Sequence, residues 1–289
     1  MGELRNRDTS AAAIHPRRVG DIEVTVLSDG YLDATLAAVR NPPPDADDLI
    51  RRQGGRVPPR INVNTFLVKS AGRFALIDTG SGDSMGPTLG QLPRALAAAG
   101  VAPEAIDTVL LTHMHPDHSN GLSDAAGRRL FPNAEVVLHE NEIPHWFDDA
   151  AMARAIESQR IRYFGQARHQ IAPYRRDRVR EFRGGEVFPG VTAIPIPGHT
   201  PGHTAYLIAS GRERLLVWGD TVHIPELQVP RPETTMMFDT DPAAAAASRV
   251  RVFDMVAAEN LPVAGMHLHF PGFARMTKSA GNFQLIPES

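Results

Sequence analysis

The segment LTHMHPDHSNGL, residues 111–122, contains three histidines and an aspartate within six consecutive positions. The chain has no cysteine, so a metal bound here would take imidazole and carboxylate ligands, which zinc and neighbouring first-row metals accept. A single loop histidine is more often a surface residue than a ligand. Burying several of these side chains without a cation would leave repelling charges or unpaired polar groups. The cluster therefore predicts a metal site.

Further histidines and aspartates follow other apolar segments of strand type. AIPIPG precedes His199, LLVWG precedes Asp220, and PVAGM precedes His267. Loops at one end of a sheet can converge on one point. The combined set holds five histidines and two aspartates: His113, His115, Asp117, His118, His199, Asp220 and His267. These are too many donors for one tetrahedral ion but match two ions, roughly 3.5 to 4 Å apart, that share a carboxylate and activate a bridging hydroxide.

The elements that must position these residues alternate between strands and helices. A Pro- and Gly-rich segment at residues 40–59 predicts an exposed loop. Asp241 is a good N-cap before Pro242, so we expect a long helix from there to about Asn260. Helices are also predicted at residues 88–100 and over most of 141–167. Strands are predicted at residues 21–30, 63–70, 73–80, 106–113, 134–140, 190–198, 204–210, 214–220 and 262–267.

Length and composition indicate an ordinary globular protein. The 289 residues are 42% hydrophobic and 22% charged, and we expect a flexible N-terminal extension at residues 1–20 and one domain over residues 21–289. The net charge of −3 provides no broad basic field, so nucleic acid is not an expected partner. No segment has the length and apolarity of a membrane span or a signal peptide, which predicts a cytoplasmic protein without membrane contact.

Five motifs occur in the order typical of the metallo-β-lactamase superfamily. They are LIDTG (76–80), THMHPDH (112–118), PGHTPGH (197–203), WGD (218–220) and GMHLHFPG (265–272). Within the superfamily the chain most resembles the branch that holds methyl parathion hydrolase and the N-acyl homoserine lactonases. The resemblance implies an α/β fold, a four-layer αββα sandwich, with a dinuclear metal site in a cleft at its edge.

The same resemblance implies a role for each motif residue. The first metal would be held by His113, His115 and His199, the second by Asp117, His118 and His267, and both by Asp220. Supporting residues that orient the ligands would be Asp78, His203 and His269. His267 and His269 would point the same way on an extended segment, so either could be the ligand, and the family pattern favours His267.

Three residues are predicted to take part directly in catalysis: Asp117, Asp220 and His223. His223 stands three residues after Asp220, where homoserine lactonases place a tyrosine. It could donate a hydrogen bond to a developing oxyanion or protonate a leaving oxygen, or it could only support its neighbours. The branch lines its substrate pocket with aromatic side chains, which here would be Trp146, Phe147, Tyr163 and Phe164, although helical aromatics are as often core residues.

The expected function is hydrolysis by a dinuclear centre, in which a bridging hydroxide attacks an uncharged small-molecule ester. A lactone or carboxylic ester is favoured, and a phosphotriester is the alternative, while a basic run at 168–183 could instead attract an anion. The cofactors would be two divalent ions, zinc first, with manganese, cobalt or iron as alternatives. Alternatives of other classes are a diiron redox protein, a nuclease of the same superfamily and a non-catalytic metal-binding protein. A homodimer is expected, with residues 40–59 as its contact or as a lid.

Overall fold

Two seven-stranded sheets form the centre of the fold in this computed structural model, which describes residues 13–288. The first sheet has the order β1-β2-β4-β5-β6-β7-β8, and the second has the order β16-β15-β14-β12-β11-β10-β9. The first sheet consists of β1 (Ile14–Val19), β2 (Ile22–Asp33), β4 (Arg60–Ser70), β5 (Arg73–Ile77), β6 (Thr108–Leu110), β7 (Glu135–His139) and β8 (Val179–Phe182). The second consists of β9 (Gly185–Phe188), β10 (Val191–Pro195), β11 (Thr204–Ser210), β12 (Glu213–Val217), β14 (Val263–Ala264), β15 (Phe273–Ser279) and β16 (Asn282–Glu288). A two-stranded ribbon pairs β3 (Val39–Arg40) with β13 (Thr235–Met236).

The helices are short apart from α9. They are α1 (Ala46–Arg52), α2 (Leu92–Ala98), α3 (Pro116–Ser119), α4 (Glu142–Trp146), α5 (Asp149–Arg154), α6 (Glu157–Gln159), α7 (Gln166–Ile171), α8 (Pro225–Gln228) and α9 (Pro242–Ala258), with a π-helical turn η3 at Arg160–Gly165 and 3-10 turns η1 (Leu36–Ala38), η2 (Pro103–Ala105) and η4 (Gly219–Thr221).

The main core lies between the two sheets. Phe66 and Ile77 of the first sheet belong to the same buried cluster as Tyr206 and Val217 of the second. Side chains on the other face of each strand meet the helices because successive residues of a strand point to opposite faces. Both faces of each sheet therefore need a partner layer.

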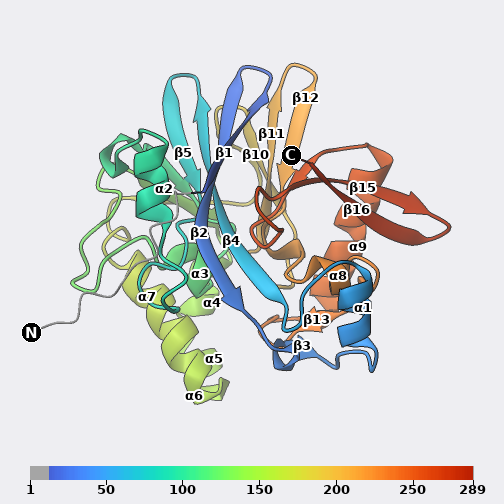
Figure 1. The fold of residues 1–289 in the computed structure, drawn as a ribbon. Helices are drawn as coiled ribbons and strands as arrows, with labels where there is room; N and C mark the ends of the chain where they lie inside the picture. Colours follow the sequence, from blue (N-terminus) through green and yellow to red (C-terminus); the bar gives the residue numbers. More distant parts are fainter. Residues whose placement is uncertain (1–12, 289) are drawn as a thin grey trace, which may run out of the picture.

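Helices supply the two outer layers. Leu92 and Leu96 of α2 and Ile171 of α7 pack in one cluster with Leu76 of the first sheet. Phe253 of α9 packs with the outer face of the second sheet. Figure 1 shows α2 and α7 on one side of the paired sheets and α9 on the other. The predicted four-layer αββα sandwich is confirmed.

Helix α9 begins as its sequence predicts. The Asp241 side chain accepts a hydrogen bond from the Ala244 amide at 3.0 Å, and Pro242 occupies the first helical position, where no amide hydrogen is needed. Buried Val252, Phe253 and Val256 then recur at helical spacing on the face that meets the sheet.

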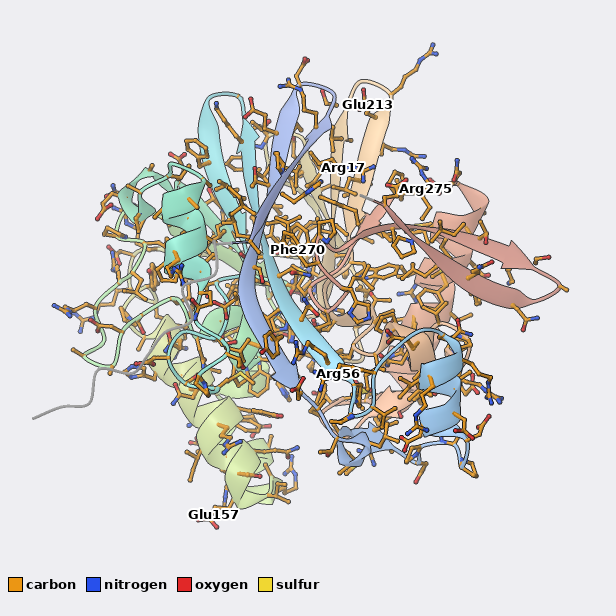
Figure 2. All side chains as sticks on the ribbon, in the orientation of Figure 1. Arg17, Arg56, Glu157, Glu213, Phe270 and Arg275 are labelled. Carbon is orange, nitrogen blue, oxygen red and sulfur yellow. The ribbon has the colours of Figure 1, made fainter. Side chains whose placement is uncertain are left out.

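The predicted extension at residues 1–20 is wrong for residues 14–19, which form β1. This strand pairs with β2 from Ile14 opposite Leu27 to Val19 opposite Ile22. It is also joined to the C-terminal hairpin, because Glu288 of β16 accepts hydrogen bonds from Arg17 at 2.7 Å and from Arg275 at 2.6 Å (Figure 2). Residues 1–12 of the predicted extension lie outside the described residues.

Residues 40–59 are not simply the exposed loop that their composition predicts. They contain α1, with Asp47 and Asp48 in its first turn and Arg51 and Arg52 in its last, which suits the helix dipole. The apolar face of α1 packs against the β3–β13 ribbon and α8 through Ala46, Leu49, Ile50, Leu227 and Met236. Within residues 13–288, no helix has the length and apolarity needed to cross a membrane.

Candidate metal centre

All the predicted ligands lie just beyond the carboxyl ends of strands. His113 to His118 follow β6, His199 follows β10, Asp220 follows β12 and His267 follows β14. Since β6 belongs to the first sheet and the other three strands to the second, the ligand loops meet where the two sheets face each other. The sequence motifs are brought together as their positions predict.

One group of donors consists of three imidazole nitrogens and one carboxylate oxygen. His115 Nδ1 lies 3.0 Å from His113 Nε2 and 2.9 Å from His199 Nε2, and the latter two are 3.2 Å apart. Asp220 Oδ2 lies 3.1 Å from His199 Nε2 and 3.6 Å from His113 Nε2. A tetrahedral zinc ion with bonds of about 2.0 to 2.1 Å has donors about 3.3 Å apart. The spacing of this group, the three-histidine set, therefore fits one such ion.

A second group uses the other oxygen of the same carboxylate. Asp220 Oδ1 lies 3.2 Å from His118 Nε2 and 3.1 Å from His267 Nε2, and Asp117 Oδ2 lies 3.5 Å from each of these nitrogens. These four donors, the Asp117 set, have the separations of ligands around one ion. Asp220, His223 and His267 also offer donor atoms within 4.8 Å of one another. Asp220 thus belongs to both sets, one oxygen to each.

Buried atoms without a hydrogen-bond partner test independently whether the cluster fits a metal ion. His118 Nε2, His267 Nε2 and Asp220 Oδ1 are buried and have no hydrogen-bond partner. Buried polar atoms are nearly always paired, and an unpaired one needs an explanation. All three belong to the Asp117 set, and a cation at its centre would satisfy them together.

Hydrogen bonds on the far side of each imidazole hold it in place. His118 Nδ1 donates to Asp78 at 2.8 Å, His199 Nδ1 donates to Asp239 at 2.7 Å, and His267 Nδ1 donates to the Asn62 carbonyl at 2.7 Å. Each bond places one ring proton away from the cluster, so in the neutral ring the nitrogen that faces the cluster is the one available to a metal. Asp78 also accepts from the amide and hydroxyl of Thr112 at 2.7 Å each, which places it where its predicted supporting role requires.

His203 lies behind Asp220 and does not face the donors. Its Nδ1 is 3.2 Å from the Ile196 carbonyl, and its Nε2 accepts the Asp220 amide hydrogen at 2.8 Å. Burial lowers the pKa of His203 to about 3, so the ring is neutral and able to accept this bond. The geometry agrees with the supporting role predicted for His203.

The bond recorded for His269, which was predicted to have a supporting role, is with Glu226 of α8 at 2.5 Å and not with a residue of either donor set. The His269 side chain is 55% exposed. Alternate residues of a strand share a face, but β14 ends at Ala264 and residues 266–269 bend. His267 and His269 therefore point to different surroundings.

The charges at the cluster suit a bound cation. Burial lowers the pKa of His113 and His115 well below the usual value, which keeps both rings neutral. Burial would raise the pKa of Asp220, but His118 and His267 hold it well below its usual range, so the carboxylate is anionic.

Against the effect of burial, the nearby carboxylates raise the pKa of His118 and His267. Asp220 and Asp239 likewise raise the pKa of His199 to about 9 against the effect of burial. A bound cation would take the place of these protons, because neutral imidazole and ionised carboxylate are the forms that bind metals.

The four predicted pocket aromatics separate into different environments. Tyr163 places its ring 5.1 Å from that of His115, and the Trp146 ring lies 5.4 Å from His115 on a buried side. Phe164 packs behind Trp146 in the core of the outer layer. Phe147 instead packs against the Arg175 guanidinium at 3.9 Å. Tyr163 and Trp146 contact the cluster, whereas Phe147 and Phe164 lie behind it.

Sequence reasoning missed several residues that contact the cluster. The Phe238 ring lies 5.1 Å from His223, 5.8 Å from His199 and 6.1 Å from His115. Asp239 follows it, and Glu142 is buried beside the His113 and His199 loops. The segment TMMFDTD carried no metal-ligand spacing, and its only signal was its position just before the N-cap of α9.

Comparison with known proteins defines the class of this fold and site. Residues 58–267 match the metallo-β-lactamase superfamily, and the chain belongs to that family. The resemblance seen in the motifs is thereby confirmed.

Individual relatives cover the chain to different extents. The uncharacterized protein YobT of Bacillus subtilis (strain 168) is 29% identical over 163 residues, which is 56% of this chain and 63% of YobT, so less than two thirds of that relative is matched. The hydrolase AbOPH of the β-lactamase superfamily superposes with a TM-score of 0.89 at 30% identity, over 96% of this chain and 98% of its own. AidC, a dizinc quorum-quenching lactonase, superposes with the same TM-score and coverage at 24% identity, which shows the fold.

Proposed function

We propose that the protein is a metal-dependent hydrolase that holds two divalent ions and cleaves an uncharged ester, with a lactone as the preferred substrate. The observation that carries the proposal is that two donor sets share the Asp220 carboxylate. Its Oδ2 belongs to the three-histidine set and its Oδ1 to the Asp117 set. When bound, such an ion pair supplies Lewis acidity and makes hydroxide available near neutral pH. Zinc is the ion that we expect first, because the donors are nitrogen and oxygen at tetrahedral spacing.

The protein's own part is to hold the donors rigidly and to place a proton acceptor near the reacting bond. His223 Nε2 lies 3.0 Å from Asp220 Oδ2, and burial lowers the pKa of His223 to about 4, so the neutral ring donates to the carboxylate. Its Nδ1 is buried without a partner. With its proton on Nε2, the ring has a lone pair at Nδ1, so His223 is our candidate for a group that accepts a proton during the reaction.

The surroundings of the cluster support an uncharged substrate. Tyr163 and Phe238, from segments far apart in the chain, both place rings against His115. Burial, followed by the Asp117 charge, raises the pKa of Tyr163 to about 12, so its hydroxyl is neutral near pH 7. Aromatic walls of this kind bind the apolar parts of a ligand and offer no charge to a polyanion. The names of the similar structures, a hydrolase and a dizinc lactonase, agree with this chemistry.

The test is a side-by-side measurement of hydrolysis on zinc-loaded protein. The substrates are a long-chain N-acyl homoserine lactone and an aryl phosphotriester, and Asp220→Asn is the matched control. We expect lactone turnover with kcat/KM of at least about 10⁴ M⁻¹s⁻¹, lost in the control. A larger value for the phosphotriester would reverse the substrate preference. No turnover of either substrate by protein that holds two ions would overturn the ester assignment.

Two further expectations stay proposals. A homodimer formed through residues 40–59 would involve the exposed side of α1. A gel-filtration mass equal to one subunit would contradict it. A cytoplasmic location is likewise a prediction, to be checked by fractionating cells that produce the protein.

A further inference from the structure

Glu142, the first residue of α4, is a fully buried carboxylate with four hydrogen bonds. Its Oε2 accepts from the Met114 amide at 2.9 Å and from the Trp146 indole at 2.8 Å. Its Oε1 accepts from the Thr200 hydroxyl at 2.5 Å and from the Gly202 amide at 3.0 Å. Glu142 is 0% exposed, so bulk solvent does not reach these bonds.

Three of the four donors lie on the loops that carry the three-histidine set. Met114 stands between His113 and His115, while Thr200 and Gly202 follow His199 by one and three positions. The two loops come from different sheets, after β6 and β10. One carboxylate therefore fixes the distance between the His113–His115 segment and His199.

Within the described residues Glu142 forms no salt bridge, and its only recorded electrostatic effect on a neighbouring imidazole is on His145, where it opposes the larger effect of burial on the pKa. All four recorded donors are neutral, and none of the ion pairs within residues 13–288 includes Glu142. A buried charge without a counter-charge is costly. A divalent cation in the three-histidine set would lie between the two loops that Glu142 joins and would compensate such a charge.

We propose that Glu142 is a positioning residue for the three-histidine set. It holds the two loops at the separation that one ion requires, and its charge favours a cation there. The Asp117 set has an ionised carboxylate of its own and does not bond to Glu142, so its affinity depends on Glu142 much less. The inference rests on the proposed two-metal function and assigns to Glu142 a role in metal affinity.

The experiment measures both metal-binding constants of the folded, metal-depleted protein. Zinc is titrated in competition with a chromophoric chelator into the wild type, Glu142→Gln and Glu140→Gln. Glu140 is the matched control, since it lies two residues away and forms a surface ion pair with Arg183 at 2.7 Å. We expect Glu142→Gln to weaken one of the two constants 10- to 100-fold, the usual effect of losing a group that orients metal ligands, and to change the other less than about threefold. Glu140→Gln should match the wild type.

Further variants separate this role from folding. Circular dichroism checks each protein before titration. If Glu142→Gln does not fold, Thr200→Val and Thr200→Ser replace it, since valine removes the hydroxyl donor and serine restores it. The valine variant should bind the same ion more weakly and the serine variant should recover.

The outcomes distinguish the inference from the function it rests on. If both zinc-binding constants of Glu142→Gln equal those of the wild type, the inference is overturned and the proposed function is not. The same holds for Thr200→Val if Glu142→Gln does not fold. A wild type that binds fewer than two ions would overturn the proposed function and the inference together.

Discussion

At the scale of single residues, Asp220 is the residue that both donor sets share. Each of its carboxylate oxygens belongs to a different donor set, and its amide is held by His203. These ligands were predictable because the crowding of histidines and aspartates has no low-energy explanation without a cation. His269 was not predictable, because two residues of sequence separation indicate a shared direction only where the backbone is extended.

His223 gives the sharpest prediction at this scale. The rings of His223 and His267 stack with centroids 5.0 Å apart. Replacing His223 with phenylalanine keeps an aromatic ring in this position but removes the hydrogen bond to Asp220. We expect kcat to fall at least about 100-fold, within the range for lost acid–base assistance. Zinc content should be unchanged because each four-donor set is complete without His223, although His223 lies beside Asp220 and His267. Steady-state kinetics with matched metal analysis measures this. An unchanged kcat would assign His223 to a purely structural role.

At the scale of elements, the carboxyl ends of strands and the loops that follow them position the donor atoms of the two sets. The predicted strands were recognised from hydrophobic alternation and α9 from its N-cap, and both are local signals in the sequence. Helix α1 was not predicted because residues 40–59 are rich in Pro and Gly at both ends. The short amphipathic segment between them is buried only by contact with α8 and the β3–β13 ribbon, which are distant in the sequence. Glu142 and Phe238 were missed because their partners are distant in sequence.

Asp29 of β2 illustrates how one strand stabilises a loop near the site. It accepts the amide hydrogens of Ser81 at 2.8 Å, Leu92 at 2.9 Å and Gly90 at 3.2 Å. Asp29→Ala leaves these donors unpaired, and we expect the free energy of unfolding to fall by about 3 kcal/mol. Urea denaturation of metal-loaded protein measures it. A loss below about 0.5 kcal/mol would show that water replaces the carboxylate without cost.

The same residue predicts a pH dependence. Burial raises the pKa of Asp29 from 3.8 to about 6, so the folded chain holds this proton more tightly than the unfolded chain does. The stability gained is fully present below pH 3.8 and is lost as the pH rises through about 6. The stability of the wild type relative to the non-titrating Asp29→Asn should therefore decrease from pH 4 to pH 7. A difference that is constant or grows with pH would refute this.

At the scale of the whole molecule, two sheets from the two halves of the chain face each other and bring their ligand loops to one edge (Figure 1). The αββα order was predictable from the repeated alternation and the motif order. The sheet strands β1, β8, β9, β15 and β16 were missed. Strands β8 and β9 are fixed by pairing with β7 and β10. Strands β1, β15 and β16 are fixed by pairing and by the Arg17–Glu288–Arg275 contacts, which join the two ends of the described chain and leave no local signal.

Because the donors come from both sheets, bound metal should stabilise the entire fold. A ligand present at 100 times its dissociation constant adds about 2.7 kcal/mol to the stability of the state that binds it. We expect removal of metal by a chelator to lower Tm by several degrees and zinc to restore it. Calorimetry of one sample before and after zinc addition tests this. An identical Tm in both forms would mean that the cluster folds without needing a cation.

The most direct test of the account is the number of zinc ions that one chain binds at saturation. Elemental analysis after dialysis against buffered zinc should give two ions per chain for the wild type and fewer than two for Asp220→Ala, because the shared carboxylate is lost. A wild-type chain that holds at most one ion, or an Asp220→Ala chain that keeps two, would contradict it.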